Sequence, residues 1–328
     1  MIADRVAATA SGIGTGGIGG NTSLGLIGCG VALTDGDTSA SSTTVSHLGS
    51  VDTTSENAGK AVPSQQDSGS RDNGVWVSAS ATWLKKTDPS GEFSGDVVTA
   101  VTGYDHKVMT DMVAGLALGS EAGYIDTRYN KGSIRAKSVS LAPYIGYALT
   151  DWLTIDATIG HAWVYYNYAD GSAAAEVYSG GHADRWFGAT DLTAKEHWDS
   201  WVFTQSAGYM RISEVEKFYQ AGTTFVPTSS VNVGEIRGTL GLGYDFYASW
   251  GKMTPSAFVR LQYDVPHQGA TTLATGYVTT TDTTSAVFGV SMDAQIDKVW
   301  TFNVVGYTEQ FRQNSSARTL GLNARYAF

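Results

Sequence analysis

From Gly74 to Phe328 the sequence alternates between apolar and polar residues with a period of two, and this alternation restricts the possible folds most strongly. The segment from Glu235 to Phe246 shows it well. Its apolar or aromatic members are Ile236, Leu240, Leu242, Tyr244 and Phe246. The residues between them are charged, hydroxylated or glycine. Because successive side chains of a strand point to opposite faces, the pattern predicts a strand with one face for hydrocarbon and one for water.

The same alternation recurs along the segments 138–149, 257–264 and 286–296, where Tyr144 and Phe258 are the two exceptions. Scanned in this way, the sequence predicts about twelve strands, each long enough for the ~9–11 residues that a tilted strand needs to cross a bilayer. The predicted spans are 74–86, 93–105, 109–122, 134–148, 152–168, 182–195, 198–212, 232–247, 252–265, 282–295, 298–310 and 316–328.

The predicted connections alternate between short turns and long polar stretches. Short turns are expected at His106 to Val108, Thr150-Asp151, Glu196-His197, Ser249 to Gly251 and Ile296-Asp297, and longer stretches include 169–181, 213–231 and 266–281. Outer-membrane barrels have short turns on the periplasmic side and long loops outside. The sequence therefore predicts an all-β fold, a closed antiparallel transmembrane β-barrel in a bacterial outer membrane. A soluble sandwich or propeller is disfavoured, because it would not need outward Tyr, Trp and Leu on every strand.

Composition agrees with a large sheet. Only 16% of the residues are charged, 11% are aromatic, and 39 are glycine. No stretch of about 18 apolar residues is present, so a transmembrane helix is not expected. The net charge of −10 argues against a nucleic-acid partner, which would require a basic surface. Cys29 is the only cysteine, which excludes an intramolecular disulfide and a cysteine-based zinc cluster.

Residues 1–73 have a different composition, dominated by Gly, Ser, Thr and Asp, and we interpret them as a linker before a barrel domain at 74–328. Such a segment buries too little apolar surface to offset its chain entropy. Ile2 to Ala10 could form one short helix. The first ten residues lack a basic start and an apolar core, so they do not resemble a secretory signal. We therefore expect the chain to be a fragment, a processed product or the product of a misplaced start.

Motifs for chemistry are weak throughout, and the sequence predicts no enzyme, no cofactor and no metal. The GxGxxG match at Gly12 to Gly17 has neither the preceding strand nor the following helix of a dinucleotide site. Leu26 to Cys29 resembles a lipobox without its usual upstream context. No GxSxG is present, and the histidines lack metal-ligand spacing: His47, His106, His161, His182, His197 and His267. Trp83, Trp163, Trp186 and Trp300 are candidates for aromatic belts at the membrane interfaces.

Charged residues on the polar side of the alternation are predicted to face the lumen. These residues are Asp156, Glu235, Arg237, Asp245, Arg260, Asp293 and Arg325. They could line a pore that holds water or a polypeptide segment, or they could pair across neighbouring strands, and the two roles are compatible. Inside a barrel such charges find water or partners, whereas a lipid-facing Arg or Lys costs ~2–4 kcal/mol at the midplane.

The last strand carries a second signal. Alternate residues from Leu320 to the terminal Phe328 are apolar, and this arrangement resembles the C-terminal assembly signal of bacterial outer-membrane barrels. The residues predicted to form it are Leu320, Leu322, Tyr326 and Phe328. Such a strand would close the barrel and remove the unpaired edges that lipid could not satisfy.

The ordered series of strand patterns over residues 74–328 resembles the autotransporter β-domain, the translocator of type V secretion. The resemblance rests on GVWVSASATWL (74–84), DMVAGLALGSEAGYID (111–126), SLAPYIGYALTDWLTIDATIGHAWVYYN (140–167), ADRWFGATDLTA (183–194), EIRGTLGLGYDF (235–246) and the last strand. It implies an outer-membrane translocator and anchor that works without bond chemistry. Its implied partners are the lipid bilayer, the outer-membrane assembly machinery and an N-terminal passenger in cis, with the barrel itself monomeric.

This chain departs from the family pattern upstream of the barrel. The family typically threads a helical segment through the pore, whereas the residues just before Gly74 are rich in Ser, Asp, Gly and Gln. Because only about 73 residues precede the predicted barrel, a substantial passenger is not expected in the given sequence. Two alternatives remain open, namely a stand-alone outer-membrane barrel that acts as a channel or adhesin, and a hydrolase embedded in a barrel.

Overall fold

The computed structural model describes residues 73–87, 92–109, 111–128, 131–150, 152–170, 177–221, 224–226, 228–265, 284–296, 299–311 and 315–328. The linker, the short helix, the GxGxxG match and Cys29 lie outside these residues. Among the described residues, no helix is long and apolar enough to cross a membrane.

The described chain folds into fifteen β-strands joined in one antiparallel sheet. They are β1 (Asn73–Lys86), β2 (Phe93–Met109), β3 (Met112–Thr127), β4 (Gly132–Ala148), β5 (Leu153–Asp170), β6 (Val177–Trp198), β7 (Trp201–Glu216), β8 (Tyr219–Ala221), β9 (Thr224–Val226), β10 (Ser229–Tyr244), β11 (Phe246–Ala248), β12 (Gly251–Val265), β13 (Thr284–Ile296), β14 (Trp300–Gln310) and β15 (Ser315–Ala327). The strands β8, β9 and β11 have three residues each, and the other twelve form the wall.

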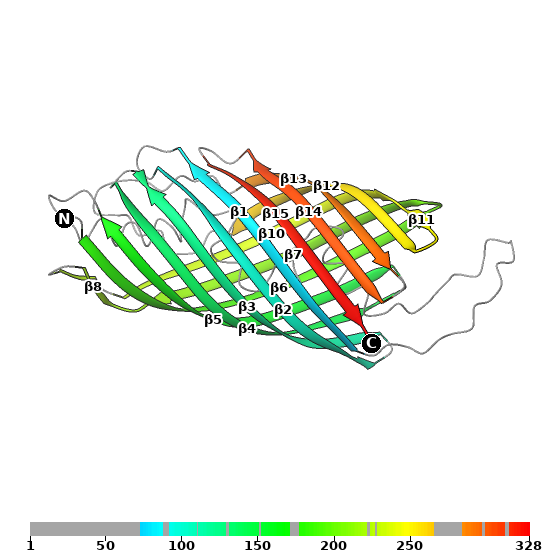
Figure 1. Cartoon of the computed structure of the whole chain (residues 1–328), viewed down its shortest axis with the longest axis horizontal. Helices are drawn as coiled ribbons and strands as arrows, with labels where there is room; N and C mark the ends of the chain where they lie inside the picture. The colour runs from blue at the N-terminus through cyan, green and yellow to red at the C-terminus, as the bar shows by residue number, and fades with distance from the viewer. Residues whose placement is uncertain are drawn as a thin grey trace, which may run out of the picture.

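The wall closes on itself, as the alternation predicts. Each long strand pairs with its neighbours along the chain, and β1 pairs with β15 from Gly74 opposite Ala327 to Lys86 opposite Ser315. Figure 1 shows the long strands running obliquely around an elongated barrel. A closed antiparallel wall satisfies the backbone groups of all its strands without leaving an edge. The predicted barrel of about twelve strands is therefore confirmed.

The two ends of the barrel differ. The strand ends that tight connections such as Trp198 to Trp201 join lie at one end, which we call the short-turn end, and the strand ends that longer stretches of sequence join lie at the other, the long-loop end (Figure 1). The wall also begins and finishes at the short-turn end. The amide of Asn73 donates to the carbonyl of Phe328 at 3.2 Å, and the Phe328 amide donates back at 3.0 Å.

Strand positions agree with the predicted spans to within a few residues, but two predicted turns are wrong. His106 to Val108 lie inside β2, where the His106 ring nitrogen is 3.0 Å from the Asn73 side-chain oxygen. Glu196 and His197 lie inside β6, and the turn follows at Asp199, which has a φ of 52°. Asp tolerates this left-handed conformation better than most residues, so it marks the turn better than the polar residues before it.

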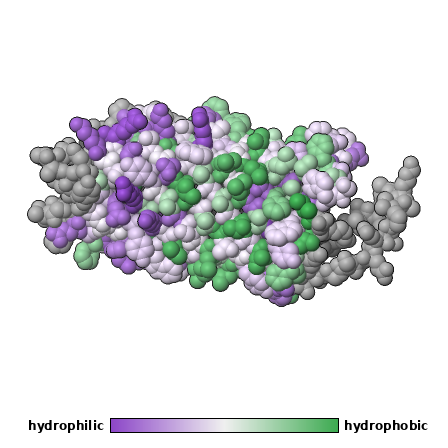
Figure 2. All heavy atoms as spheres, in the orientation of Figure 1, coloured by the Kyte–Doolittle hydropathy of each residue, from purple (hydrophilic) through white to green (hydrophobic). Residues whose placement is uncertain are grey.

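The outer face of the wall is apolar. Leu240 and Leu242, the residues on which the alternation argument depends, have 52% and 49% of their surface exposed instead of packing into a core. Every long strand contributes at least one exposed large apolar residue, and the four tryptophans predicted for interface belts all lie on this face. Figure 2 shows hydrophobic residues across the middle of the barrel and toward the short-turn end, with hydrophilic residues gathered toward the long-loop end.

The two exceptions to the alternation have a common cause. Tyr144 and Phe258 are buried on the inner face, where each lies directly across the strand pair from a glycine. A Cβ on Gly115 would collide with the Tyr144 ring, and one on Gly289 would collide with Phe258. The inner face therefore accommodates large rings where the neighbouring strand provides no side chain. Trp76 over Gly103 and Phe187 over Gly160 follow the same arrangement.

Candidate functional site in the barrel lumen

The inner face carries most of the buried polar side chains of the described chain. Of the seven residues predicted to face the lumen, six are buried on the side of the wall opposite the exposed apolar residues, and Asp293 is partly buried. The structure does not bring these seven together at one point. It distributes them among four groups of interacting side chains along and around the barrel, and a fifth group on the inner face contains none of them.

The first group, the seam cluster, links the closing pair of strands, β1 and β15, to β2 and β4. It consists of Trp76, Asp105, Tyr144 and Arg325. The Arg325 guanidinium donates to both oxygens of Asp105, at 2.6 and 3.4 Å. The Tyr144 hydroxyl lies 3.4 Å from Asp105 and accepts a hydrogen bond of 2.7 Å from the Trp76 indole. The cluster therefore connects β15, β2, β4 and β1. Its ion pair is almost fully buried, with side-chain exposures of 7% and 1%.

The second group, the mid-wall cluster, consists of Asp156, Asp191, Gly208 and Arg237. Arg237 on β10 donates to both oxygens of Asp191 on β6, at 2.6 and 3.1 Å. The pair reaches across β7 at Gly208, which is the register partner of both residues. A Cβ on Gly208 would overlap the Asp191 carboxylate and lie 3.1 Å from the Arg237 Nε, so the missing side chain makes room for the bridge.

The third group, the tyrosine cluster, lies nearer the long-loop end and consists of Glu121, Tyr166, Arg185 and Glu214. Arg185 donates to Glu214 at 2.6 Å, and Tyr166 donates to the other oxygen of Glu214 at 2.7 Å. Glu121 lies 3.8 Å from Arg185. Farther toward the loops, the rings of Tyr166, Tyr168 and Tyr219 stack in sequence, with centroids 5.6 and 5.4 Å apart.

The fourth group, the β12 group, includes residues of β10, β12, β13 and β14. The Gln262 amide donates to Glu235 at 3.2 Å and accepts from the Ser285 hydroxyl at 3.1 Å. The Arg260 guanidinium lies over two aromatic rings, 5.7 Å from the Phe258 centroid and 5.8 Å from the Tyr307 centroid. Cation–π contact of this kind stabilises a buried guanidinium.

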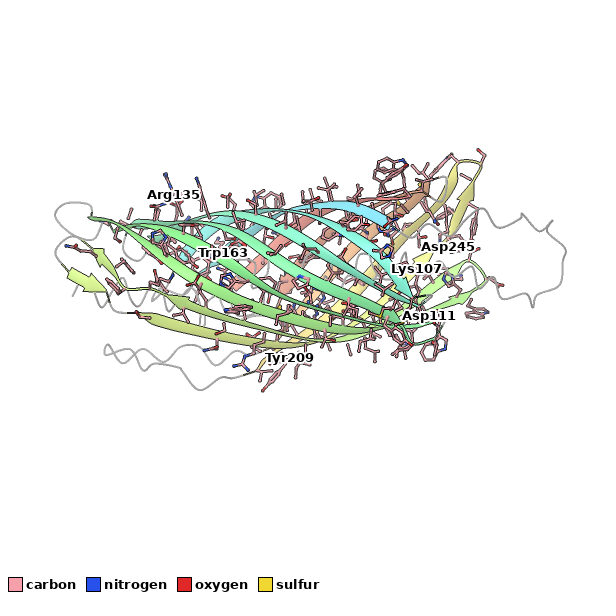
Figure 3. All side chains as sticks on the ribbon, turned by 90° about the horizontal axis from the view of Figure 1, so that it is seen from below. Lys107, Asp111, Arg135, Trp163, Tyr209 and Asp245 are labelled. Atoms are coloured by element: carbon pink, nitrogen blue, oxygen red, sulfur yellow. The ribbon has the colours of Figure 1, made fainter. Side chains whose placement is uncertain are left out.

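The last group, the rim group, lies at the short-turn end. Lys252 Nζ lies 3.4 Å and His197 Nδ1 3.7 Å from the Asp245 carboxylate, at the break between β10 and β11. Asp293 accepts a hydrogen bond of 2.8 Å from the Asn303 amide. Figure 3 shows Asp245 and Asp111 at this end of the barrel and Arg135 near the opposite end.

Sequence reasoning missed several of the strongest inner-face partners. Asp105, Asp191 and Arg185 were not singled out, although each holds one half of a buried ion pair. The alternation alone indicates that Asp105 faces inward, because it lies an even number of residues from the inward Val97 and Val101. The identity of the partner strand was not in the sequence pattern, because Asp105 pairs with a residue 220 positions away.

Several inner-face atoms have no hydrogen-bond partner among the described residues. They include both carboxylate oxygens of Glu121 and of Asp156, one oxygen of Glu235, and the Nε and Nη2 of Arg260. Buried polar atoms are normally satisfied by protein or by ordered water. The lumen therefore presents charged groups that can hold water or the polar backbone of another segment. Within the same described residues, no group of three His, Cys, Asp or Glu side chains is arranged to hold a metal ion.

A closed antiparallel barrel with an apolar outer band and a charged interior defines the class of outer-membrane β-barrels. Residues 75–306 match the autotransporter β-domain family, and the chain belongs to that family. The resemblance seen in the sequence is thereby confirmed. The protein is a translocator barrel of the bacterial outer membrane. The translocator barrels of this family are not enzymes.

Solved structures of the same fold include three autotransporter domains. The β domain of the Bordetella autotransporter BrkA is 14% identical with a TM-score of 0.67, covering 78% of this chain and 100% of its own. The translocator domain of NalP from Neisseria meningitidis is 13% identical with a TM-score of 0.63, covering 92% and 100%. The transport unit of AIDA-I from Escherichia coli is 10% identical with a TM-score of 0.56, covering 79% and 91%. No curated protein sequence matches this chain.

Proposed function

We propose that this barrel exports or displays a passenger attached in cis to its N-terminal side, and that the lumen is the route. The observation that carries the proposal is the position of Asn73, which lies beside Phe328 at the short-turn end. In outer-membrane barrels that end faces the periplasm. Polypeptide upstream of Asn73 thus joins the wall on the periplasmic side. To reach the outside it must cross the membrane, and hydrocarbon does not accept irregular backbone with unsatisfied polar groups.

The chemistry of the inner face supports this route. An extended or helical segment inside the barrel needs partners for its polar groups, and the oxygens of Glu121, Asp156 and Glu235 that have no hydrogen-bond partner among the described residues could accept hydrogen bonds from it. Arg260 could donate to its carbonyl oxygens. Twelve strands lie between barrels of about 8 strands, which side chains nearly fill, and those of about 16, which hold an open aqueous channel. Such a lumen suits a single passing segment.

We also propose that the last strand is the signal by which the outer-membrane assembly machinery recognises the chain. Leu320 and Leu322 are exposed on the outer face of β15, and the terminal Phe328, directly after the strand, is exposed as well. Tyr326 lies against Trp300 with ring centroids 4.7 Å apart, and Phe328 stacks on Tyr326 at 5.8 Å. The exposed row is thus held in a fixed arrangement on the strand that closes the wall.

The barrel is proposed to act as a monomer without hydrolytic activity. Each of the twelve long strands has a neighbour on both sides, so none of them needs a second chain to complete its pairing. Most lumen carboxylates with partners are engaged by arginine, lysine, tyrosine, threonine, glutamine or asparagine, as Glu214 is by Arg185 and Tyr166. An activated nucleophile would require a base beside it, held by a third group.

The route can be tested by mapping an epitope tag on intact cells. The chain is expressed behind a secretory leader in a Gram-negative host with the tag at position 40, at position 249 in the tight turn after β11, or at position 275 between β12 and β13. Tags at 40 and 275 should bind antibody on intact cells, whereas the tag at 249 should do so only after permeabilisation. Heat-modifiable gel mobility checks that all three barrels are folded.

The proposal is wrong if the folded chain exposes the tag at 275 but protects the tag at 40 until the cells are permeabilised. That outcome would leave a stand-alone barrel whose N-terminal segment stays in the periplasm. Ester hydrolysis by the purified barrel, lost on replacement of rim Ser and His residues, would contradict the proposed lack of enzymatic activity.

A further inference from the structure

Two basic residues, Arg135 and Lys137, occupy successive outward-facing positions of β4, and both are exposed. Directly beyond them on the same face the strand becomes apolar, from Val139 through Ile145 to Tyr147, which are all exposed. The apolar stretch ends at Leu149, and its length matches the ~9–11 residues that a tilted strand needs to cross the hydrocarbon. Arg135 and Lys137 are therefore the first two outward side chains beyond the hydrocarbon on the long-loop side.

Aromatic side chains frame the two cations. Arg135 is the register partner of Tyr124 on β3, and its guanidinium carbon lies 5.5 Å from the centre of the Tyr124 ring. Lys137 is the register partner of Tyr165 on β5, which is exposed. Trp163, the partner of Val139, is exposed one step closer to the membrane. Aromatic residues of this kind mark the interface between hydrocarbon and headgroups in outer-membrane barrels.

The two cations have no acidic partner of their own. Among the described residues no carboxylate lies within ion-pair distance of Arg135 or Lys137. The acidic residue on the adjoining outward position of β3, Asp126, instead accepts a hydrogen bond of 2.7 Å from the Tyr124 hydroxyl. Figure 3 shows Arg135 near the long-loop end, directed away from the barrel. In a chain with a net charge of −10, this outward pair of positive charges requires an explanation.

We propose that Arg135 and Lys137, framed by Tyr124 and Tyr165, bind a phosphate group of a phosphorylated glycolipid in the outer leaflet. Guanidinium matches phosphate geometry through two parallel hydrogen bonds, and ammonium adds a point charge. Basic residues at a membrane surface are attracted to anionic headgroups. The acyl chains of such a lipid would lie along the apolar side chains of Val139 and Leu141. This inference depends on the outer-membrane location of the barrel and not on the passenger route.

The test counts lipids bound to the purified full chain by native mass spectrometry in detergent. The probes are bis-phosphorylated lipid A, the same glycolipid without phosphates, and inorganic phosphate as a competitor. The variants are the double substitution R135Q/K137Q and a matched control, K85Q/R211Q, which removes two other exposed cations from β1 and β7. Heat-modifiable mobility confirms that each variant is folded.

The wild-type chain and the control should bind bis-phosphorylated lipid A with similar affinity, and R135Q/K137Q should bind it about tenfold more weakly or worse. The lipid without phosphates should bind all three chains equally weakly. The proposal is overturned if both double variants lose affinity to the same extent, which would indicate general charge attraction. It is also overturned if inorganic phosphate at ~10 mM displaces the lipid completely, because the site would then recognise the free anion.

Discussion

The two faces of the barrel wall are formed by alternate residues of the same strands, yet they are stabilised in different ways. On the outer face, Leu240 and its neighbours contribute individually, because each meets hydrocarbon and needs no particular partner. On the inner face, Arg325 and Arg237 each depend on one carboxylate from a distant strand. The comparison indicates that the outer face should respond to the polarity and depth of a substitution, and the inner face to the loss of a specific partner.

The largest effect is expected where an inner-face pair is broken. Asp105→Ala would leave the buried Arg325 guanidinium without its carboxylate, and removing one partner of a buried ion pair costs roughly 3–5 kcal/mol. Urea unfolding of the refolded barrel in detergent, followed by tryptophan fluorescence, measures this loss. The matched double variant D105L/R325M should recover most of it. A single variant as stable as the wild type would show that the seam cluster does not hold the wall.

A charge on the outer face is expected to have the next largest effect. Leu240→Arg places a guanidinium in the hydrocarbon and should cost about 2–4 kcal/mol, whereas Val215→Arg should cost about 0–1 kcal/mol. Val215 lies beyond the exposed native Arg211 on β7, so its surroundings already accept a cation. The same unfolding experiment in lipid vesicles gives both values. Equal losses at the two positions would contradict an apolar band of limited height.

A smaller effect is expected when the space beneath an inner-face bridge is filled. Gly208→Ala puts a methyl group against Asp191 and Arg237, and overpacking of this kind costs about 1–3 kcal/mol. Gly238→Ala is the matched control, because the nearest atom to its added Cβ is a backbone oxygen at 4.0 Å. The mobility shift on heating should occur at a lower temperature for Gly208→Ala alone. If both variants melt together, the bridge does not depend on the missing side chain.

The smallest effect is expected for an inner-face carboxylate without a partner. Asp156→Asn removes a negative charge beside Asp191 without breaking any hydrogen bond among the described residues, so stability should change by less than the ~1–3 kcal/mol expected for Gly208→Ala. Urea unfolding provides the value. A loss comparable to that of Asp105→Ala would mean that Asp156 has an essential partner outside the described residues, and the distinction between paired and unpaired lumen carboxylates would fail.

The sequence alone was sufficient to predict the strands and the two faces, because a period of two is a local property that each segment carries in itself. It did not predict the side-chain pairs of the lumen. The partner of Arg325 is Asp105 on β2, beyond the closing strand pair, and that contact follows from closure and register, not from local pattern. The sequence also did not explain why Tyr144 and Phe258 interrupt the alternation, because the glycines that make room for their rings lie on neighbouring strands.

The pairing of β1 with β15 also has a consequence for how the wall is made. Thr82 and Thr319, whose hydroxyls are 2.9 Å apart, are separated by 237 residues, so this contact cannot form until the final strand has been synthesised. A chain that stops after β14 would present two bare strand edges, which a bilayer does not tolerate. We expect such products to remain outside the membrane, within reach of proteases. We therefore expect closure by the C-terminal strand to act as a proofreading step, because only a finished wall has no bare edge.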